Sequence, residues 1–142
     1  MRLMALLLLF GSWFPSGASD PVVTIVADAD ATLIEDAAGA WANGTGPLFV
    51  GRTNQPTNSR RRAILRFDVA DALPTDAIVE SVELTLRLNP SNPGGVITMH
   101  RLLGDWSEGP TFSGGGNGNP SQPGDVTWIH TTYPTDKWLE SG

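Results

Sequence analysis

The segment Asp105-Trp106-Ser107-Glu108-Gly109 places two carboxylates three residues apart around a tryptophan. A glycosidase needs two carboxyl groups roughly 5 to 10 Å apart across a sugar, one of them held protonated. Residues at this spacing in a turn can meet that distance. Acidic turn residues, however, usually bond to nearby backbone N–H groups, and a tryptophan beside them usually packs into the core. We therefore predict an architectural segment, with sugar stacking on Trp106 as the alternative and no catalytic residue.

The arginines Arg60-Arg61-Arg62 and Arg66 form a second group that could do chemistry. If Arg62 and Arg66 share the outer face of one strand, their guanidinium groups lie about 13 Å apart, since a strand rises roughly 3.3 Å per residue. That spacing suits two carboxylates of an acidic polysaccharide, each held by a bidentate fork. The alternative is cross-strand pairing with acids such as Glu83.

An acidic group early in the chain is a candidate metal site. Asp28 and Asp30 precede Glu35 and Asp36. Calcium takes six to eight oxygen ligands from carboxylates and carbonyls, but this spacing lacks the glycine and the distal glutamate of an EF-hand. We expect either a structural calcium held by Asp28 and Asp30 or a solvated acidic stretch, and no other cofactor.

The first residues determine where the protein acts. Arg2 precedes an almost unbroken apolar run over residues 3–14, and small residues follow at 16–19. This order is typical of a secretory signal, and the run is short for a membrane span. We predict a signal peptide over residues 1–19, with a retained anchor as the alternative. The mature chain, residues 20–142, is expected to be one secreted domain without a membrane span.

Charge and cysteine content exclude some partners. Without Arg2, eight basic residues face 15 acidic ones, which gives a formal net charge of −7. Such a chain is unsuited to binding nucleic acid through the phosphate backbone. The sequence contains no cysteine, so an exported chain has no disulfides. This combination favours a bacterial secreted or surface protein.

Short apolar segments separated by glycine and proline predict an all-β fold. Alternation is clearest at 62–69, where Ala63, Leu65 and Phe67 are expected to face the core, and at 82–88, where four aliphatic residues share one face. We predict an antiparallel β-sandwich of jelly-roll type and no helix. The predicted strands are 22–26, 48–50, 62–69, 82–88 and 96–102.

Three segments together carry a family resemblance: RRRAILRFDVADALPTDAIVESVELTLRL, then ITMHRLLGDWSEG, then GDVTW. In this order they resemble the bacterial DNRLRE domain, a secreted β-sandwich module related to carbohydrate-binding module family 96, from about residue 27 onward. The resemblance implies a jelly roll and, for members called carbohydrate-binding, attachment to polysaccharides such as alginate. Family domains continue past the T-W segment, so we expect this domain to be incomplete at its C-terminus.

These observations predict a non-catalytic secreted module that binds an acidic extracellular polysaccharide. The alternatives are a structural or adhesive surface module and the N-terminal piece of a polysaccharide-degrading enzyme, with a catalytic or surface domain attached beyond residue 142. An exposed aromatic beside the arginines would favour carbohydrate binding, and Trp41, Tyr133 and Trp138 are further aromatic candidates. The predicted binding residues are Arg60, Arg62, Arg66, Trp106 and Trp128.

Overall fold

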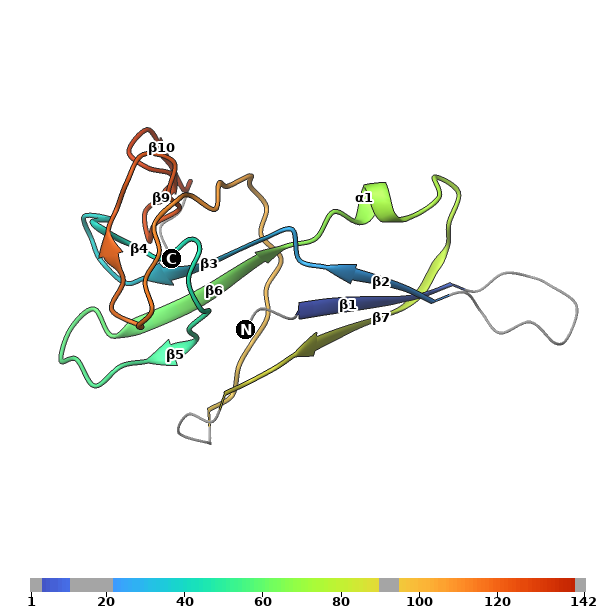
Figure 1. Ribbon diagram of the computed structural model, residues 1–142, viewed down its shortest axis with the longest axis horizontal. Coiled ribbons are helices and arrows are strands. Elements are labelled where there is room, and N and C mark those ends of the chain that lie inside the picture. Colours follow the sequence, from blue (N-terminus) through green and yellow to red (C-terminus); the bar gives the residue numbers. More distant parts are fainter. Residues whose placement is uncertain (1–3, 11–21, 90–94, 140–142) are drawn as a thin grey trace, which may run out of the picture. The chain divides into compact units, whose positions relative to one another are not determined.

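The computed structural model describes residues 4–10, 22–89 and 95–139 (Figure 1). These residues divide into two compact units, of which unit 1 comprises Met1–Asp28 and Arg66–Asn92, and unit 2 comprises Ala29–Leu65 and Pro93–Gly142. Strands dominate both units, and the sheets are antiparallel. The all-β prediction is therefore confirmed, while the jelly-roll connectivity stays a prediction.

Unit 1 is built on a three-stranded sheet in the order β2-β1-β7, with β1 (Met4–Phe10) in the middle. The strands β2 (Val22–Val26) and β7 (Val79–Leu86) both run antiparallel to it. Ile25 is buried, because one residue of its own strand and apolar residues of the segment 67–77 pack against it. Those neighbours are Val23, Phe67, Val69, Ala72, Leu73 and Ala77.

A single helical turn, α1 (Val69–Ala72), corrects the prediction of no helix. Asp68 caps it, since its Oδ1 accepts a hydrogen bond from the backbone N–H of Asp71 at 3.1 Å. An N-cap side chain of this kind satisfies a donor that a helix start leaves unpaired. The predicted strand at 82–88 is found at β7, but its aliphatic side chains at Val82 and Leu86 stay exposed.

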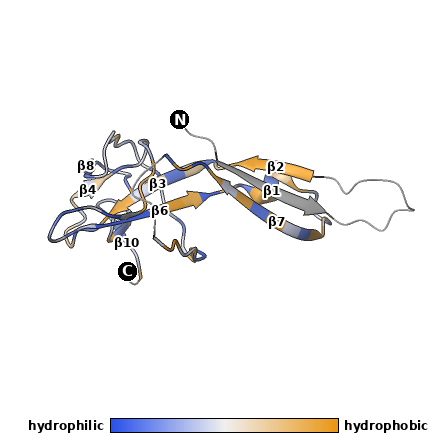
Figure 2. Ribbon diagram, turned by 90° about the horizontal axis from the view of Figure 1, so that it is seen from below, coloured by the Kyte–Doolittle hydropathy of each residue, from blue (hydrophilic) through white to orange (hydrophobic). Residues whose placement is uncertain are grey.

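Unit 2 contains the larger core. Its main sheet has the order β3-β6-β5, formed by β3 (Ala29–Ile34), β6 (Arg60–Arg66) and β5 (Gly51–Arg52). All six residues of β3 are buried, which its small and β-branched side chains allow. Figure 2 shows β6 hydrophilic at its start and hydrophobic toward its end. The buried core cluster is Ala29, Ala31, Leu33, Ile64, Trp106, Val126 and Trp128.

Two short strand pairs complete unit 2. β4 (Trp41–Ala42) pairs with β8 (Asn119–Pro120), and β9 (His130–Thr132) pairs with β10 (Asp136–Lys137). The β4–β8 pair joins an early segment to the glycine-rich loop at 111–124. Among the described residues, no helix is long and apolar enough to cross a membrane.

Two predicted strands are absent. Residues 48–50 form no strand, because the backbone N–H of Phe49 bonds to Oγ1 of Thr32 at 3.0 Å instead of to a neighbouring strand. Residues 96–102 also have no regular secondary structure, and Val96, Ile97 and Met99 are exposed. β7, the strand that precedes this segment in the sequence, pairs with β1.

The predicted core face of β6 is only partly buried, and the opposite face also meets the core. Ile64 is buried in the core, whereas Ala63 and Leu65 are only half-buried. Alternation then places Arg60 and Arg62 on the face of Ile64. Charged side chains can occupy a core-facing strand face at its rim, because their long stems pack on apolar surface while their heads reach water.

The predicted signal peptide is only partly described. Residues 1–3 and 11–19 lie outside the described residues, as does the predicted boundary after residue 19. Residues 4–10 form β1, so the apolar core of the predicted signal is a strand of this structure.

Candidate functional site

Arg60 is held by an acid of the same sheet. Its Nη2 lies 2.6 Å from Oε1 of Glu35, and its backbone N–H donates to Oε2 at 2.8 Å. Glu35 directly follows β3, the neighbour of β6. The hydrogen bonds from the Arg60 side chain, and then from its backbone, lower the pKa of Glu35. The predicted alternative of pairing with an acid is thus realised for Arg60, with Glu35 as the partner in place of Glu83.

Arg60 and Arg62 both lie over the indole ring of Trp128. Their guanidinium carbons are 5.4 Å and 4.6 Å from its centroid. A guanidinium within about 6 Å of an aromatic centroid gains a cation–π attraction. Trp128 is only 7% exposed, so the arginines cover one ring face and the core takes the rest. Trp128 therefore orients arginines and offers no free face to a sugar ring.

Arg66 and Asp28 pair within unit 1. Nε of Arg66 donates to Oδ2 of Asp28 at 2.8 Å, and the Asp28 backbone N–H donates to the Arg66 carbonyl at 3.0 Å. Asp30 is buried in β3. Among the described residues there is no group of three or more acids, histidines or cysteines arranged to hold a metal ion. The predicted calcium site at Asp28 and Asp30 stays a prediction.

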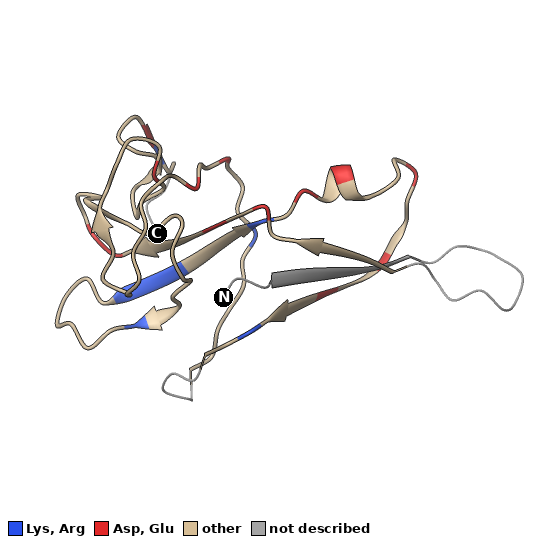
Figure 3. Ribbon diagram, in the orientation of Figure 1, with Lys and Arg blue, Asp and Glu red and all other residues tan. Residues whose placement is uncertain are grey.

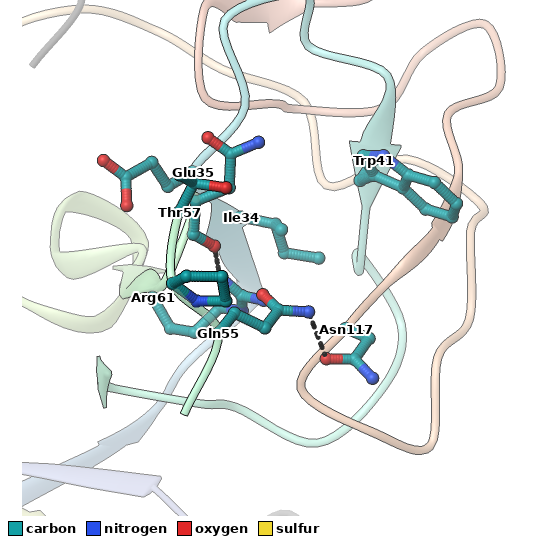
Figure 4. A pocket seen from close by; sticks show the side chains of 9 residues that line it. Ile34, Glu35, Trp41, Gln55, Thr57, Arg61 and Asn117 are labelled. Atoms are coloured by element: carbon teal, nitrogen blue, oxygen red, sulfur yellow. Dashed lines mark hydrogen bonds between the residues drawn. The ribbon is translucent and has the colours of Figure 1, made fainter. Parts of the chain in front are cut away.

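A groove of about 410 Å³ lies in unit 2 and opens beside Trp41 (Figure 4). Trp41 is 42% exposed at the start of β4. The other lining side chains are mostly uncharged and polar, and several come from the loop between β5 and β6. They are Ile34, Glu35, Gln55, Pro56, Thr57, Asn58, Arg61 and Asn117.

Arg61 joins the walls of this groove. It is buried on the opposite side of β6 from its two arginine neighbours, and it donates to the carbonyl of Gly116, to the carbonyl of Asn58 at 2.7 Å and to Oε1 of Gln55 at 3.2 Å. Gln55 in turn donates from Nε2 to Oδ1 of Asn117 at 3.3 Å (Figure 4). Burial lowers the pKa of Arg61. The Arg61 side chain thereby holds together two loops that are far apart in the sequence, one containing Gln55 and Asn58 and the other Gly116.

Basic residues of unit 2 gather at the start of β6 and on β5 (Figure 3). Arg52 is the register partner of Arg60. Arg62, two residues further along β6, is exposed. Arg52 donates to Oγ of Ser59 at 3.3 Å. These arginines form a local basic strip on a chain whose net charge is negative.

The segment Asp105 to Gly109 is architectural. Trp106 is 8% exposed and belongs to the main core. The Ser107 hydroxyl donates to the Gly124 carbonyl at 2.5 Å, and its backbone N–H donates to Thr131. Gly109 has φ of 77°, and a Cβ at this position would overlap Asp125. Trp106 therefore offers no free face to a sugar ring.

Sequence reasoning named Trp41 as an exposed aromatic but did not connect it with the groove. It missed Gln55, Asn58 and Asn117 entirely, because amides in turn-rich segments are so common that they carry no signal. Pairing of β4 with β8 brings Trp41 near the glycine-rich loop, but the sequences of these two-residue strands show no periodic pattern that would predict the pairing. The β6 arginines were found because three successive arginines are unusual.

His130 is buried beside Thr127, and this pair makes stability depend on pH. The Thr127 hydroxyl accepts from the backbone N–H of His130 at 3.0 Å and of Ile129 at 3.3 Å, and lies 2.9 Å from Nδ1 of His130. Its own proton is therefore left to donate to Nδ1, which requires a neutral imidazole. Burial, and then the charge of Lys137, lowers the pKa of His130.

We expect the free energy of unfolding to decrease as the pH falls below about 6.5, the ordinary pKa of histidine. The folded-state pKa lies below the unfolded one, so the stabilisation is complete above pH 6.5 and is lost on acidification toward the folded value. Urea unfolding between about pH 5 and 7 measures it. His130→Asn should remove this slope, and His100→Asn, at an exposed site, should retain it. Equal slopes in both variants would contradict the assignment.

The described residues define the chain as an all-β protein with antiparallel sheets. No model of a known protein family, no curated protein and no solved structure matches the chain.

Proposed function

We propose that this protein is a non-catalytic, secreted carbohydrate-binding module that takes an extracellular polysaccharide in the groove beside Trp41. One observation carries the proposal: a half-exposed tryptophan shares a groove with the amides of Gln55, Asn58 and Asn117. The resemblance to DNRLRE domains and the predicted signal peptide support the same function. The proposal includes a jelly-roll sandwich and no covalent chemistry.

The groove has the chemistry that a sugar ring requires. The indole of Trp41 supplies a flat apolar surface for the C–H face of a pyranose, and aromatic side chains contribute large contact areas of this kind. Amide side chains both donate and accept hydrogen bonds, which suits hydroxyl groups that do the same. A few polar groups in a largely preformed concave site are the usual source of orientation and specificity.

The basic strip supports an acidic polymer. Arg60 is neutralised by Glu35, whereas Arg62 contacts the Trp128 ring and Arg52 a serine hydroxyl. A guanidinium stacked on an aromatic ring keeps its donors for a carboxylate, which it can hold in a bidentate fork. We therefore propose that a polymer extending beyond the groove meets Arg62 and Arg52 through its carboxylates, and that a sugar ring stacks on Trp41 in place of Trp106 and Trp128.

The structural or adhesive alternative is less well supported. It would be favoured by a polar sheet face with every tryptophan buried. Trp41 is instead exposed in the same groove as Arg61. An exposed tryptophan in a groove lined by polar side chains supports a carbohydrate ligand.

We expect Trp41→Ala to weaken binding to an anionic polysaccharide about tenfold, which corresponds to about 1.4 kcal/mol. The measurement is affinity electrophoresis of the full chain through gels containing alginate, pectin or a neutral glucan, at two salt concentrations. Phe112→Ala is the matched control, because Phe112 is 60% exposed and lies outside the groove. It should migrate like the wild type.

Arg62→Ala should reduce retardation by the acidic gels and its sensitivity to salt, because it removes a charge that pairs with the polymer. It should leave any retardation by a neutral glucan unchanged. Free migration of the folded wild type in every gel would overturn the proposal. Retardation that Trp41→Ala leaves intact would move the site away from the groove.

A further inference from the structure

The sequence contains two Asn-Gly pairs, and the fold places their asparagines in different environments. In such a pair the glycine nitrogen can attack the side-chain carbonyl of the asparagine, because glycine has no Cβ to hinder the approach. Asn43 precedes Gly44, and Asn117 precedes Gly118. Asn43 is 1% exposed, whereas Asn117 is exposed on the wall of the groove (Figure 4). The two pairs share their covalent chemistry but differ in access.

Hydrogen bonds hold every group of the first pair that the reaction needs. Nδ2 of Asn43 donates to the Pro47 carbonyl at 2.8 Å, and Oδ1 accepts from the Ser113 N–H at 2.9 Å. The Gly44 N–H, which would be the nucleophile, donates to the Thr111 carbonyl at 2.8 Å. Attack would break these bonds at a buried position, where unpaired polar groups are unfavourable. The fold therefore protects Asn43.

Asn117 is held less tightly. Its Oδ1 accepts from Nε2 of Gln55 at 3.3 Å, and the Gly118 N–H donates to the Gly115 carbonyl at 3.4 Å. Both bonds are longer than about 3.2 Å, the usual upper limit for an N–H···O bond. Asn117 lies in a turn two residues before β8. Its side chain and the nucleophile can therefore meet after two weak bonds are broken.

The fold requires the glycine that makes Asn117 reactive. Gly118 has φ of 77°, in the left-handed region, and a Cβ at this position would overlap the side chain of Ile34. The next asparagine, Asn119, precedes Pro120, which has no backbone N–H to act as a nucleophile. The reactive pair is thus part of the groove wall, and its neighbour cannot react in the same way.

We propose that Asn117 is a site of spontaneous deamidation, which adds a carboxylate to the wall of the groove. The Gly118 nitrogen forms a bond to Cγ of Asn117, the Cγ–Nδ2 bond breaks, and the Gly118 amide proton leaves with the nitrogen as ammonia. Water then adds to the resulting succinimide. Breaking the new N–Cγ bond gives aspartate, and breaking the original backbone C–N bond gives isoaspartate. The reaction consumes water and neither oxidant nor reductant.

Either product makes the groove more negative. A carboxylate at residue 117 would repel an acidic sugar ring that lies against Trp41. One like charge at about 4 Å in water corresponds to about 1 kcal/mol, or about fivefold in affinity. This consequence rests on the proposed function, whereas the deamidation itself does not. The groove should therefore bind acidic polymers more weakly as the protein ages.

The test follows both Asn-Gly pairs in the full chain during incubation in a mildly alkaline buffer. Peptide mapping by tandem mass spectrometry locates the gain of one mass unit, and electron-transfer fragmentation distinguishes aspartate from isoaspartate. We expect Asn117 to convert at least about tenfold faster than Asn43, because Asn43 reacts only after local opening of the fold. In concentrated urea, where both pairs are exposed, the two rates should become similar.

Asn117→Gln is the matched control for this measurement. It keeps an amide in the groove, but its longer side chain would have to close a larger ring, so it should stay unconverted under the same conditions. Similar rates at Asn43 and Asn117 in the folded chain would overturn the proposal. So would the absence of conversion at Asn117.

Affinity electrophoresis tests the effect on the groove. Aged wild type and fresh Asn117→Asp should be retarded less by alginate than fresh wild type, while aging should not change Asn117→Gln. Retardation by a neutral glucan should stay the same in all of them. Conversion that leaves retardation by alginate unchanged would overturn the effect on binding. If fresh wild type binds no polymer, the proposed function fails, and the mass measurement still decides whether Asn117 deamidates.

Discussion

Replacing Trp106 with alanine is expected to lower the free energy of unfolding by about 3–5 kcal/mol, the usual cost of truncating a buried aromatic to alanine. Trp106 packs in one buried cluster with residues of β3, β6 and the segment before β9, including Leu33, Ile64 and Val126. Its removal leaves a cavity where three separate parts of the chain meet. Urea denaturation followed by far-UV circular dichroism measures the loss.

Trp41→Ala is the matched control for this substitution. Trp41 is exposed, so its truncation should change the free energy of unfolding by no more than about 0.5 kcal/mol, as is usual for surface positions. The two substitutions should then have different effects: Trp106→Ala lowers the free energy of unfolding, and Trp41→Ala weakens polysaccharide binding. A small effect of Trp106→Ala on stability, together with lost polysaccharide binding, would return Trp106 to the sugar site.

Asp125→Ala should destabilise the protein by about 3 kcal/mol or more, because it leaves several buried donors without an acceptor, each costing about 1–3 kcal/mol. Asp125 is fully buried. Its oxygens accept from the Thr111 N–H at 3.0 Å, the Thr111 hydroxyl at 2.5 Å and the Gln122 N–H at 2.6 Å. One carboxylate thus holds both ends of the glycine-rich loop.

The control for Asp125→Ala is Asp105→Ala, because Asp105 is an exposed acid in the segment that leads to this loop. Its substitution should cost less than about 0.5 kcal/mol. Asp125→Asn should lie between wild type and Asp125→Ala, since one oxygen remains while the new amide group meets a donor. If both aspartates proved equally tolerant, the carboxylate would not anchor the loop.

The sequence was a good guide where its pattern is local and periodic. Alternation located β6 and β7, and the short β-branched run located β2 within its observed bounds. The alternation did not determine which face of β6 is buried. Arg60 and Arg62 lie over the ring of Trp128, which is at least 66 residues further along the chain, and a local pattern cannot show that contact. Because arginine can stack on an aromatic ring, a strand face that carries arginines can still pack against the core.

The candidate site was harder to predict than the strands. Trp41, Gln55 and Asn117 meet in one groove only after β4 pairs with β8 and Arg61 bonds to both walls. Such contacts depend on tertiary pairing between segments without periodicity. The run of arginines pointed to the right strand, but its middle member, which was not among the predicted binding residues, lines the groove.

The hydrogen bonds from Arg61 to three loop residues bear on the thermodynamics of the proposed ligand binding. Because one cation already fastens the loop of Gln55 and Asn58 to that of Gly116, the walls of the groove are ordered before a sugar arrives. A preorganised site loses little conformational entropy on binding, so little of the binding free energy is offset by the ordering of loops. Calorimetry of polysaccharide oligomers should accordingly show a favourable enthalpy with only a small entropic penalty from the protein.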